Sequence, residues 1–287
     1  MAITVTDVRA HPGDSAFLVD DGVTAVLYDS GFGFTGDRVA RNICAVLGDR
    51  PLSMILLTHS HYDHALGSVH VAEHYPQAQI VAADYAAKIF TKPSARKVMA
   101  DLDRKFAARC GIFDYADRTG DLRVDIPVSD GDKVRAGDME FTVVALPGHT
   151  KCSVGYYLAS HALLLSCETL GVYDGKETIV PSCLVGYEMT LASIEKARAL
   201  DIRQILLPHH GLLGPEETAY YLSHCRDAAV TTAEAIRGIL RKGGTREDAV
   251  RYYADTFYHG DICQRYPEDA MLLNTGIMVD LLARENP

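Results

Sequence analysis

Short apolar runs that break at polar residues recur along the chain, and this pattern predicts a fold with many strands. Strand-like runs in the first 60 residues are Ile3 to Arg9, Ala16 to Asp20, Thr24 to Asp29 and Ser53 to Leu57, with a helix-like run from Gly36 to Leu47 before the last of them. Strands therefore come first and then alternate with helices. This order indicates a mixed α/β fold.

The middle of the chain continues the alternation and then departs from it. A helix is expected from Ala65 to Tyr75 and a strand from Gln79 to Ala82. A long, mostly helical insertion follows from Asp84 to about Asp117. Because lids and substrate walls are often inserted segments, we expect this one to lie near the mouth of a site.

The carboxyl-terminal part is patterned as helices over about residues 215–260. Pro215 to Arg241 and Thr245 to Tyr258 have helical periodicity, and Gly243-Gly244 separates them. The segment is rich in tyrosine, and its rings either pack the helices onto the rest of the fold or form a roof that recognises an acyl group. No separate unit is required, so residues 1–287 are expected to form a single domain.

Composition restricts the class of protein. The chain has 287 residues, 48% of them hydrophobic, and a net charge of -10, which suits an enzyme-sized core and argues against a nucleic-acid surface. No apolar run approaches the roughly 20 residues that span a bilayer. The seven cysteines are scattered without paired spacing, as in a reducing compartment. We expect a cytoplasmic protein that binds neither nucleic acid nor membrane; oligomeric state stays open, with a homodimer as one option.

The segment from His59 to His64 carries the strongest chemical signal. It places three imidazoles and a carboxylate within six residues, directly after an apolar strand-like run. Neutral imidazole nitrogens and carboxylate oxygens are ligands of zinc, iron and manganese. A loop at a strand end lets these side chains converge on one point. The spacing therefore predicts a metal site.

Three later strand-like runs also end at residues that can bind a metal. Phe141 to Leu146 leads to His149, Ala162 to Ser166 leads to Glu168, and Gln204 to Leu207 leads to His209 and His210. Each transition is marked by a nearby glycine or proline or by an abrupt polar residue. Repeated strand-then-loop units would bring one ligand each to the same edge of a sheet.

On these segments the chain resembles the metallo-β-lactamase superfamily, with His59-Ser60-His61-Tyr62-Asp63-His64 as its first motif. The resemblance implies an αββα sandwich and two divalent metal ions, zinc foremost, with iron or manganese also admitted. The implied ligands are His59, His61 and His149 at one metal and Asp63, His64 and His210 at the other. A strand-end Asp29 would lie under the metal loop.

Two positions depart from the family pattern. The family usually bridges its metals with an aspartate, whereas this chain offers Glu168, whose extra methylene extends the carboxylate by about 1.5 Å. Asp174 is a weaker substitute. His210 is preferred over His209 because the family's proline-glycine-histidine-glycine pattern has glycine at the place of His209, which leaves His209 as a supporting residue, a ligand or a packed loop residue.

The implied chemistry is hydrolysis by a hydroxide held between two metals, with Asp63 moving the proton. The resemblance favours a small-molecule acyl substrate, and among these an acyl thioester. Alternatives are an acyl-homoserine lactone and a glyoxalase II-like substrate. A rival of another class is a signalling or interaction protein with residual catalysis, and a mononuclear iron oxygenase of sulfur compounds is a further one.

Overall fold

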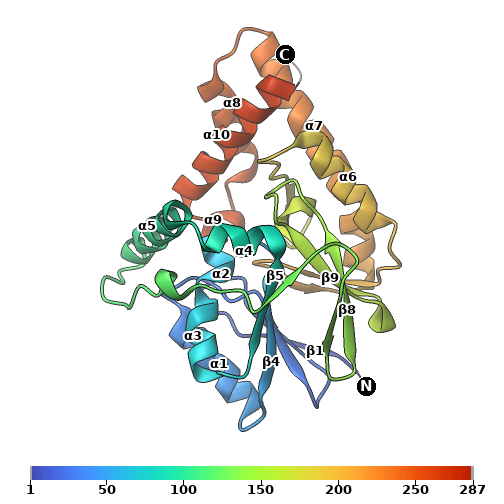
Figure 1. Ribbon diagram of the computed structural model, residues 1–287. Helices are drawn as coiled ribbons and strands as arrows, with labels where there is room; N and C mark the ends of the chain where they lie inside the picture. Colours follow the sequence, from blue (N-terminus) through green and yellow to red (C-terminus); the bar gives the residue numbers. More distant parts are fainter. Residues whose placement is uncertain (1, 286–287) are drawn as a thin grey trace.

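A computed structural model describes residues 2–285 and contains two six-stranded sheets that face each other, with helices on their outer sides (Figure 1). The first sheet has the order β1 (Thr4–Asp7), β2 (Phe17–Asp20), β3 (Ala25–Tyr28), β4 (Leu52–Leu56), β5 (Gln79–Ala83) and β6 (Ile126–Val128). Its first three strands are antiparallel, and β3 to β6 are parallel.

The second sheet has the order β14 (Gly211–Leu213), β13 (Gln204–Leu207), β10 (Leu163–Leu165), β9 (Val154–Leu158), β8 (Met139–Ala145) and β7 (Lys133–Ala136). Only the β10–β13 pair is parallel in this sheet. A separate hairpin pairs β11 (Val172–Tyr173) with β12 (Ile179–Val180).

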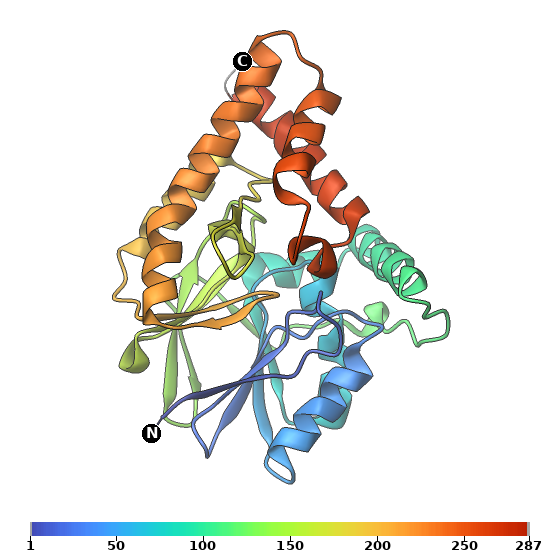
Figure 2. The same cartoon turned by 180° about the vertical axis from the view of Figure 1, so that it is seen from behind.

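The helices nearest the first sheet are α1 (Gly36–Leu47), α2 (Tyr62–Ala65), α3 (Gly67–His74), α4 (Asp84–Phe90) and α5 (Pro93–Arg109). Those of the second half are α6 (Tyr187–Arg198), α7 (Pro215–Arg241), α8 (Arg246–Phe257), α9 (Ile262–Arg265) and α10 (Glu268–Glu285). Short 3-10 turns lie at Thr119–Asp121, Ala159–His161 and Glu168–Leu170. The helices α7, α8 and α10 rise above the sandwich (Figure 2).

Local sequence explains most of these elements. Strands β2 and β3 are buried at every residue, as expected of strands covered on both faces. Helix α1 buries Val39, Ala40, Ile43 and Leu47, a spacing that forms one apolar stripe. Helix α8 begins at a capping box in which Thr245 and Asp248 satisfy each other's backbone N–H groups.

Two buried tyrosines join the sheets close to the strand ends that carry the predicted ligands. The Tyr28 hydroxyl on β3 donates to the Ser166 carbonyl at 2.8 Å, just after β10. The Tyr156 hydroxyl on β9 donates to the Leu57 carbonyl at 2.8 Å, just after β4. These bonds fix the relative position of the two sheets where their loops meet.

The predicted αββα class is confirmed, with corrections to its parts. The helical insertion ends at Arg109, and the stretch that follows it to Asp117 is not helical. The carboxyl-terminal helical segment extends past residue 260 through α10. The buried residues of α10 include Met271, Met278 and Leu282. Within residues 2–285, no helix combines the length and apolarity needed to cross a membrane.

Candidate metal centre

Loops from both sheets meet at one edge of the sandwich. His59 to His64 follow β4, and His149 follows β8. Glu168 follows β10, and His209 follows β13. Because β10 and β13 are parallel, their carboxyl ends deliver Glu168 and His209 to the same edge.

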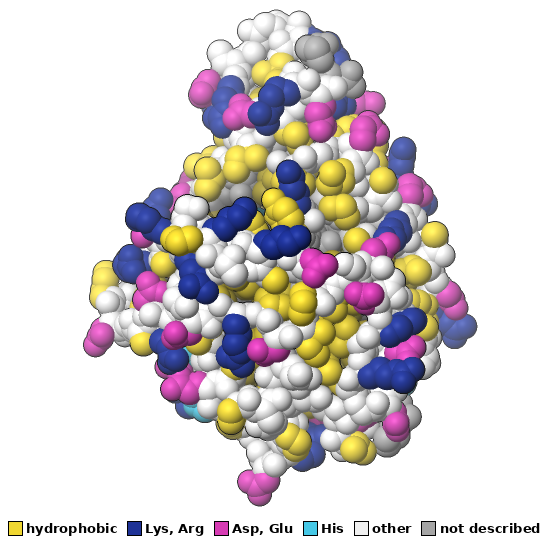
Figure 3. All heavy atoms as spheres, viewed as in Figure 1, with side chains coloured by type: hydrophobic (Ala, Val, Ile, Leu, Met, Phe, Trp, Pro, Cys, Tyr) yellow, Lys and Arg dark blue, Asp and Glu magenta, His cyan; other side chains and the backbone are white. Residues whose placement is uncertain are grey.

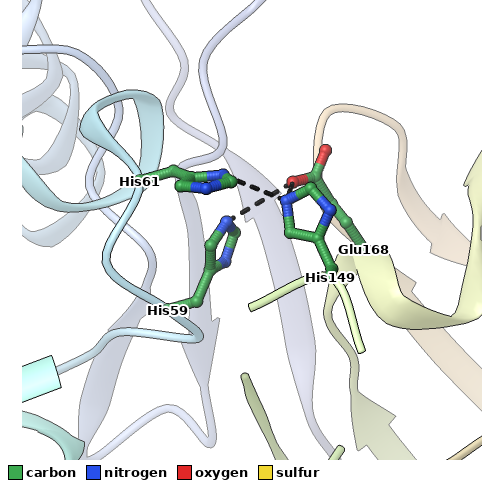
Figure 4. A group of neighbouring side chains, drawn as sticks. All are labelled: His59, His61, His149 and Glu168. Carbon is green, nitrogen blue, oxygen red and sulfur yellow. Dashed lines mark hydrogen bonds and ion pairs between the residues drawn. The ribbon is translucent and has the colours of Figure 1, made fainter. Parts of the chain in front are cut away.

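The ligand-capable atoms form two groups within the described residues. His59, His61, His149 and Glu168 make up the first, and Asp63, His64 and His209 the second. Within each group the atoms lie within 4.8 Å of one another. Figure 4 shows the first group, with three imidazoles converging on the Glu168 carboxylate.

Glu168 lies between the two groups. Its Oε2 atom is 2.8 Å from His149 Nε2, 3.4 Å from His59 Nε2 and 3.5 Å from His64 Nε2. Its Oε1 atom is 3.3 Å from His209 Nε2. One carboxylate therefore faces members of both groups, which is the position that the sequence expectation gave to a bridging acid.

Hydrogen bonds behind the imidazoles leave their other nitrogens facing the cluster. His64 Nδ1 donates to Asp29 Oδ2 at 2.7 Å, and His209 Nδ1 donates to the Gly13 carbonyl at 2.9 Å. His149 Nδ1 lies 2.9 Å from Ser182 Oγ and 3.2 Å from the Ser182 carbonyl. A proton on each Nδ1 leaves the Nε2 lone pair toward the centre, the tautomer that a metal requires.

Asp29 supports the loop as well as His64. Its carboxylate accepts from the Thr58 backbone N–H at 2.8 Å and from the Ser15 hydroxyl at 2.9 Å. The Thr58 hydroxyl lies 3.0 Å from both carboxylate oxygens. Asp29 has a positive φ of 50°, an uncommon conformation for a residue other than glycine. The sequence expectation that Asp29 lies under the metal loop agrees with this placement.

Burial and neighbouring charge set the protonation of the cluster. Burial lowers the pKa of His59 to about 3, and it holds the pKa of His61 well below its usual range, so both imidazoles are neutral. Burial alone would raise the pKa of Glu168, but the facing imidazoles, His149 foremost, hold it well below its usual range. Glu168 is therefore ionised beside the neutral imidazoles of His59 and His61, a state suited to a cation.

In the second group, neighbouring carboxylates shift the pKa values in addition to burial. Burial raises the pKa of Asp63, and the nearby Glu168 carboxylate adds to that rise. Burial would lower the pKa of His64, yet the Asp63 and Asp29 carboxylates raise it well above its usual value. Protons and a divalent cation would therefore compete for the same atoms of this group.

Buried polar atoms without a hydrogen-bond partner indicate whether the cluster could bind a metal ion. His59 Nε2 and Glu168 Oε1 are both buried and have no hydrogen-bond partner within the described residues. Leaving a buried polar atom without a partner costs about 1–3 kcal/mol. Both atoms point into the cluster, and nitrogen and carboxylate oxygen are the donors that zinc, iron and manganese accept. The residues present therefore fit a divalent metal ion.

The preference for His210 over His209 is corrected by this geometry. His209 has a positive φ of 60°, so the chain reverses there and successive side chains leave on different sides. His209 enters the cluster, whereas His210 Nδ1 lies 3.0 Å from Arg265 Nη1 and its ring contacts Tyr173. Burial, reinforced by Arg265, lowers the pKa of His210 to about 4.

Asp174, considered above as a substitute for Glu168, and Cys167, the neighbour of Glu168, lie apart from the cluster's chemistry. Asp174 accepts backbone hydrogen bonds from Lys176 and Thr178 in the β11–β12 turn, so it is not the substitute for Glu168. Cys167 is fully buried, and burial raises the pKa of its thiol to about 12. Its thiolate is therefore not available as a nucleophile at neutral pH.

A pocket with an empty volume of about 470 Å³ opens onto the cluster. His61, Asp63 and Glu168 form its polar wall, Leu102 of α5 lines it from the helical insertion, and Leu273 of α10 lines it from the carboxyl-terminal part. The face in Figure 3 carries hydrophobic side chains over its central part, with Lys and Arg side chains close by. No local signal in the sequence identifies the contribution of α10, because it depends on how the chain folds back.

Solved structures of known proteins share this fold. A metallo-beta-lactamase family protein from Thermus thermophilus aligns over 99% of this chain and 93% of its own, with a TM-score of 0.66 and 16% identity. A metallo-beta-lactamase superfamily protein from Sulfolobus tokodaii aligns over 78% of this chain and 85% of its own, with a TM-score of 0.58 and 17% identity.

Relatives found by sequence similarity align over a smaller part of this chain than these structures do. An acyl-coenzyme A thioesterase from Bos taurus is 30% identical over 152 residues, or 52% of this chain and 50% of the relative. A hydroxyacylglutathione hydrolase from Ectopseudomonas mendocina is 28% identical over 123 residues, or 43% of this chain and 35% of the relative. The chain thus spans half or less of the length of these relatives.

The sequence profile of the metallo-beta-lactamase superfamily matches residues 12–209, which run from the first loop to the last residue of the cluster. The matched part includes every residue of both ligand groups. The profile match, the two facing sheets and the paired ligand groups agree, and the chain belongs to the metallo-beta-lactamase superfamily.

Proposed function

We propose that this protein is a metal-dependent hydrolase that cleaves acyl thioesters. The observation that carries the proposal is the position of Glu168, whose two carboxylate oxygens face different ligand groups within a pocket. The relatives named above act on acyl-coenzyme A and on hydroxyacylglutathione, two acyl derivatives of a thiol carrier. Their names favour a thioester over other acyl bonds.

Divalent metal ions at this site would supply Lewis acidity, which lowers the pKa of water and polarises a carbonyl oxygen. His59, His61, His149 and Glu168 would hold one ion, and Asp63, His64 and His209 the other, with Glu168 shared. The Ser182, Asp29 and Gly13 contacts hold the imidazoles in the required orientation before substrate arrives.

Asp63 is the residue to which we give the proton transfer. It lines the pocket, and its Oδ2 atom lies 3.7 Å from both His64 Nε2 and His209 Nε2. The carboxylate can accept a proton from water and return it to the leaving thiolate, which departs as a thiol. Leu102 and Leu273 add apolar surface to the pocket in which the carbonyl would react.

The test combines metal content with turnover. Protein purified without chelator is expected to carry close to two ions per chain by inductively coupled plasma mass spectrometry. It should release free thiol from acyl-coenzyme A and acylglutathione substrates. Glu168→Gln should lower both metal content and turnover by at least tenfold, whereas the exposed Glu177→Gln should change neither.

A lactone substrate is measured beside the thioesters. Faster lactone opening than thioester cleavage would replace the thioester by a lactone and keep the metal centre. Wild-type protein that carries metal but hydrolyses no thioester and no lactone would overturn the proposed activity.

A further inference from the structure

A second pocket lies behind the ligand cluster and is lined mainly by apolar side chains. Its apolar walls are Val172 and Val180 of the β11–β12 hairpin, Ile262 of α9 and Met271 of α10. All four are at most 7% exposed. The space between these walls, counted together with the open solvent at its mouth, is about 360 Å³, and none of the charged side chains of residues 2–285 lines it.

This apolar pocket adjoins the pocket over the cluster. Tyr266 and Asn274 line both pockets, so they form the wall between them. The Tyr266 ring lies 5.1 Å from the His209 ring, centroid to centroid. Ser182 also lines the apolar pocket, and its hydroxyl lies 2.9 Å from His149 Nδ1. A group in the apolar pocket is therefore one side chain away from ligands of both groups.

Two of the polar side chains in the pocket walls, those of Tyr253 and Ser182, are already engaged. The Tyr253 hydroxyl donates to the Pro181 carbonyl at 2.7 Å, which leaves the ring as the part that lines the pocket. Ser182 is occupied by His149. A charged substrate group placed here would lose its hydration and meet only neutral side chains, which is costly, whereas an alkyl group loses only unfavourable contact with water.

We propose that the apolar pocket takes the alkyl part of the substrate's acyl group and thereby selects substrates by acyl chain. This inference rests on the proposed function, because it places the acyl carbonyl at the cluster. The carbonyl lies beside His61, Asp63 and Glu168, and the alkyl chain passes Tyr266 into the space between the hairpin and α10. Short uncharged chains are bound, and acyl groups with a terminal carboxylate are rejected.

Direct binding tests the pocket without turnover. S-alkyl thioethers of pantetheine lack the carbonyl and cannot be hydrolysed, and their affinity for the purified protein is measured by isothermal titration calorimetry. From methyl to hexyl, we expect affinity to rise by up to about fourfold for each methylene that enters the pocket. The rise stops when the pocket is full.

Two substitutions change the pocket in opposite directions. Val180→Phe fills it and should weaken binding of the hexyl thioether at least tenfold, with less than twofold effect on the methyl thioether. Met271→Ala enlarges it and should move the optimum to longer chains. Matched controls are Val98→Phe and Met189→Ala, because both side chains are exposed and neither lines the pocket.

Circular dichroism and metal content establish that each variant is folded and loaded. If Val180→Phe does not fold, Met271→Ala and the wild-type chain-length series still decide the question. A wild-type affinity that does not change with chain length would overturn the inference, as would a Val180→Phe profile equal to that of Val98→Phe.

The binding series separates this inference from the proposed function. Affinity that rises with chain length in a protein without thioesterase activity would remove the activity and keep the pocket. Hydrolysis with a flat chain-length dependence in both binding and kcat/KM would keep the activity and remove the pocket's role.

Discussion

At the residue scale, the conformation of one histidine decides which imidazole reaches the metal centre. His209 adopts the left-handed region, a conformation that costs about 1–3 kcal/mol for a residue other than glycine. The contacts of its side chain with Gly13 and the cluster offset that cost. Strain of this kind persists where surrounding contacts over-determine the conformation, as at functional sites.

We predict that His209→Ala and His210→Ala differ sharply. His209→Ala removes a nitrogen from the second ligand group, so it should lose about one metal ion per chain and at least a hundredfold in turnover. His210→Ala removes a contact with Arg265 outside the cluster and should keep the metal. Measuring the metal content of both variants shows which histidine is the ligand. Metal loss in His210→Ala alone would mean that His210, and not His209, binds the metal.

At the element scale, the first ligand loop depends on close packing of α3 against the end of β3. A Cβ atom on Gly67 would lie 1.9 Å from the Ser30 carbonyl oxygen, and the Ser30 amide in turn donates to the His64 carbonyl at 2.8 Å. The Ser30 carbonyl is part of the backbone, so it cannot move away from a new methyl group without shifting the Ser30 amide and the ligand loop bonded to it. Glycine is required here by space.

Gly67→Ala should therefore destabilise the protein by about 1–3 kcal/mol or more, the range of an overpacked core. The matched variant Gly120→Ala has no atom within 4 Å of its new Cβ and should leave stability nearly unchanged. Urea unfolding measures both. Equal midpoints for the two variants would show that the loop accommodates the methyl group.

Helix α5, which supplies a pocket wall, is tied to the loop between β3 and α1 by a buried acid. Asp103 Oδ1 accepts from the Gly33 backbone N–H at 2.9 Å, and Asp103 Oδ2 accepts from the Tyr115 hydroxyl at 2.6 Å. Burial raises the pKa of Asp103 to about 7. The folded protein thus binds a proton here that the unfolded chain, with an ordinary pKa of 3.8, releases.

The sign of the pH effect follows from this difference. Between about pH 4 and pH 7 the folded state holds more protons at Asp103, so this residue's contribution to stability falls as the pH rises. Asp103→Asn does not titrate. The free energy of unfolding of the wild type, minus that of Asp103→Asn, should therefore be larger at pH 5 than at pH 8.

Denaturant unfolding at the two pH values measures that difference. Asp101→Asn on the same helix is the control, because its exposed carboxylate faces Lys97 and solvent. A difference between wild type and Asp103→Asn that is independent of pH would contradict the raised pKa.

At the scale of the whole molecule, the metal centre joins two sheets that otherwise meet through their core. The ligands come from loops after β4, β8, β10 and β13, so bound ions would connect both halves of the sandwich. Because the unfolded chain does not assemble this site, metal binding adds to folding stability.

Removal of metal by a chelator should accordingly lower the melting temperature. A ligand present at a hundredfold excess over its Kd contributes about 2.7 kcal/mol, which corresponds to roughly 5–10 °C for a protein of this size. Addition of zinc should restore the original value. In His61→Ala the chelator should have a smaller effect, and an equal shift in this variant would place the stabilising metal elsewhere.

The sequence by itself determined the elements and most of the ligands, because both depend on residues close together in the chain. Helix α1 was predicted with its observed bounds, since an apolar stripe over Gly36–Leu47 is a local property. His59, His61, Asp63 and His64 lie within six residues of one another, so their density signals a metal without knowledge of the fold.

Only the tertiary structure decided what depends on backbone direction and on contacts between distant segments. The positive φ at His209 turns that imidazole inward and leaves His210 outside, and two adjacent histidines carry no local signal for this choice. Tyr266 and Asn274 reach the cluster from a helical segment more than 50 residues beyond the last ligand. Their place is set by the packing of α9 and α10, which buries Ile262, Met271 and Leu282 in one apolar cluster.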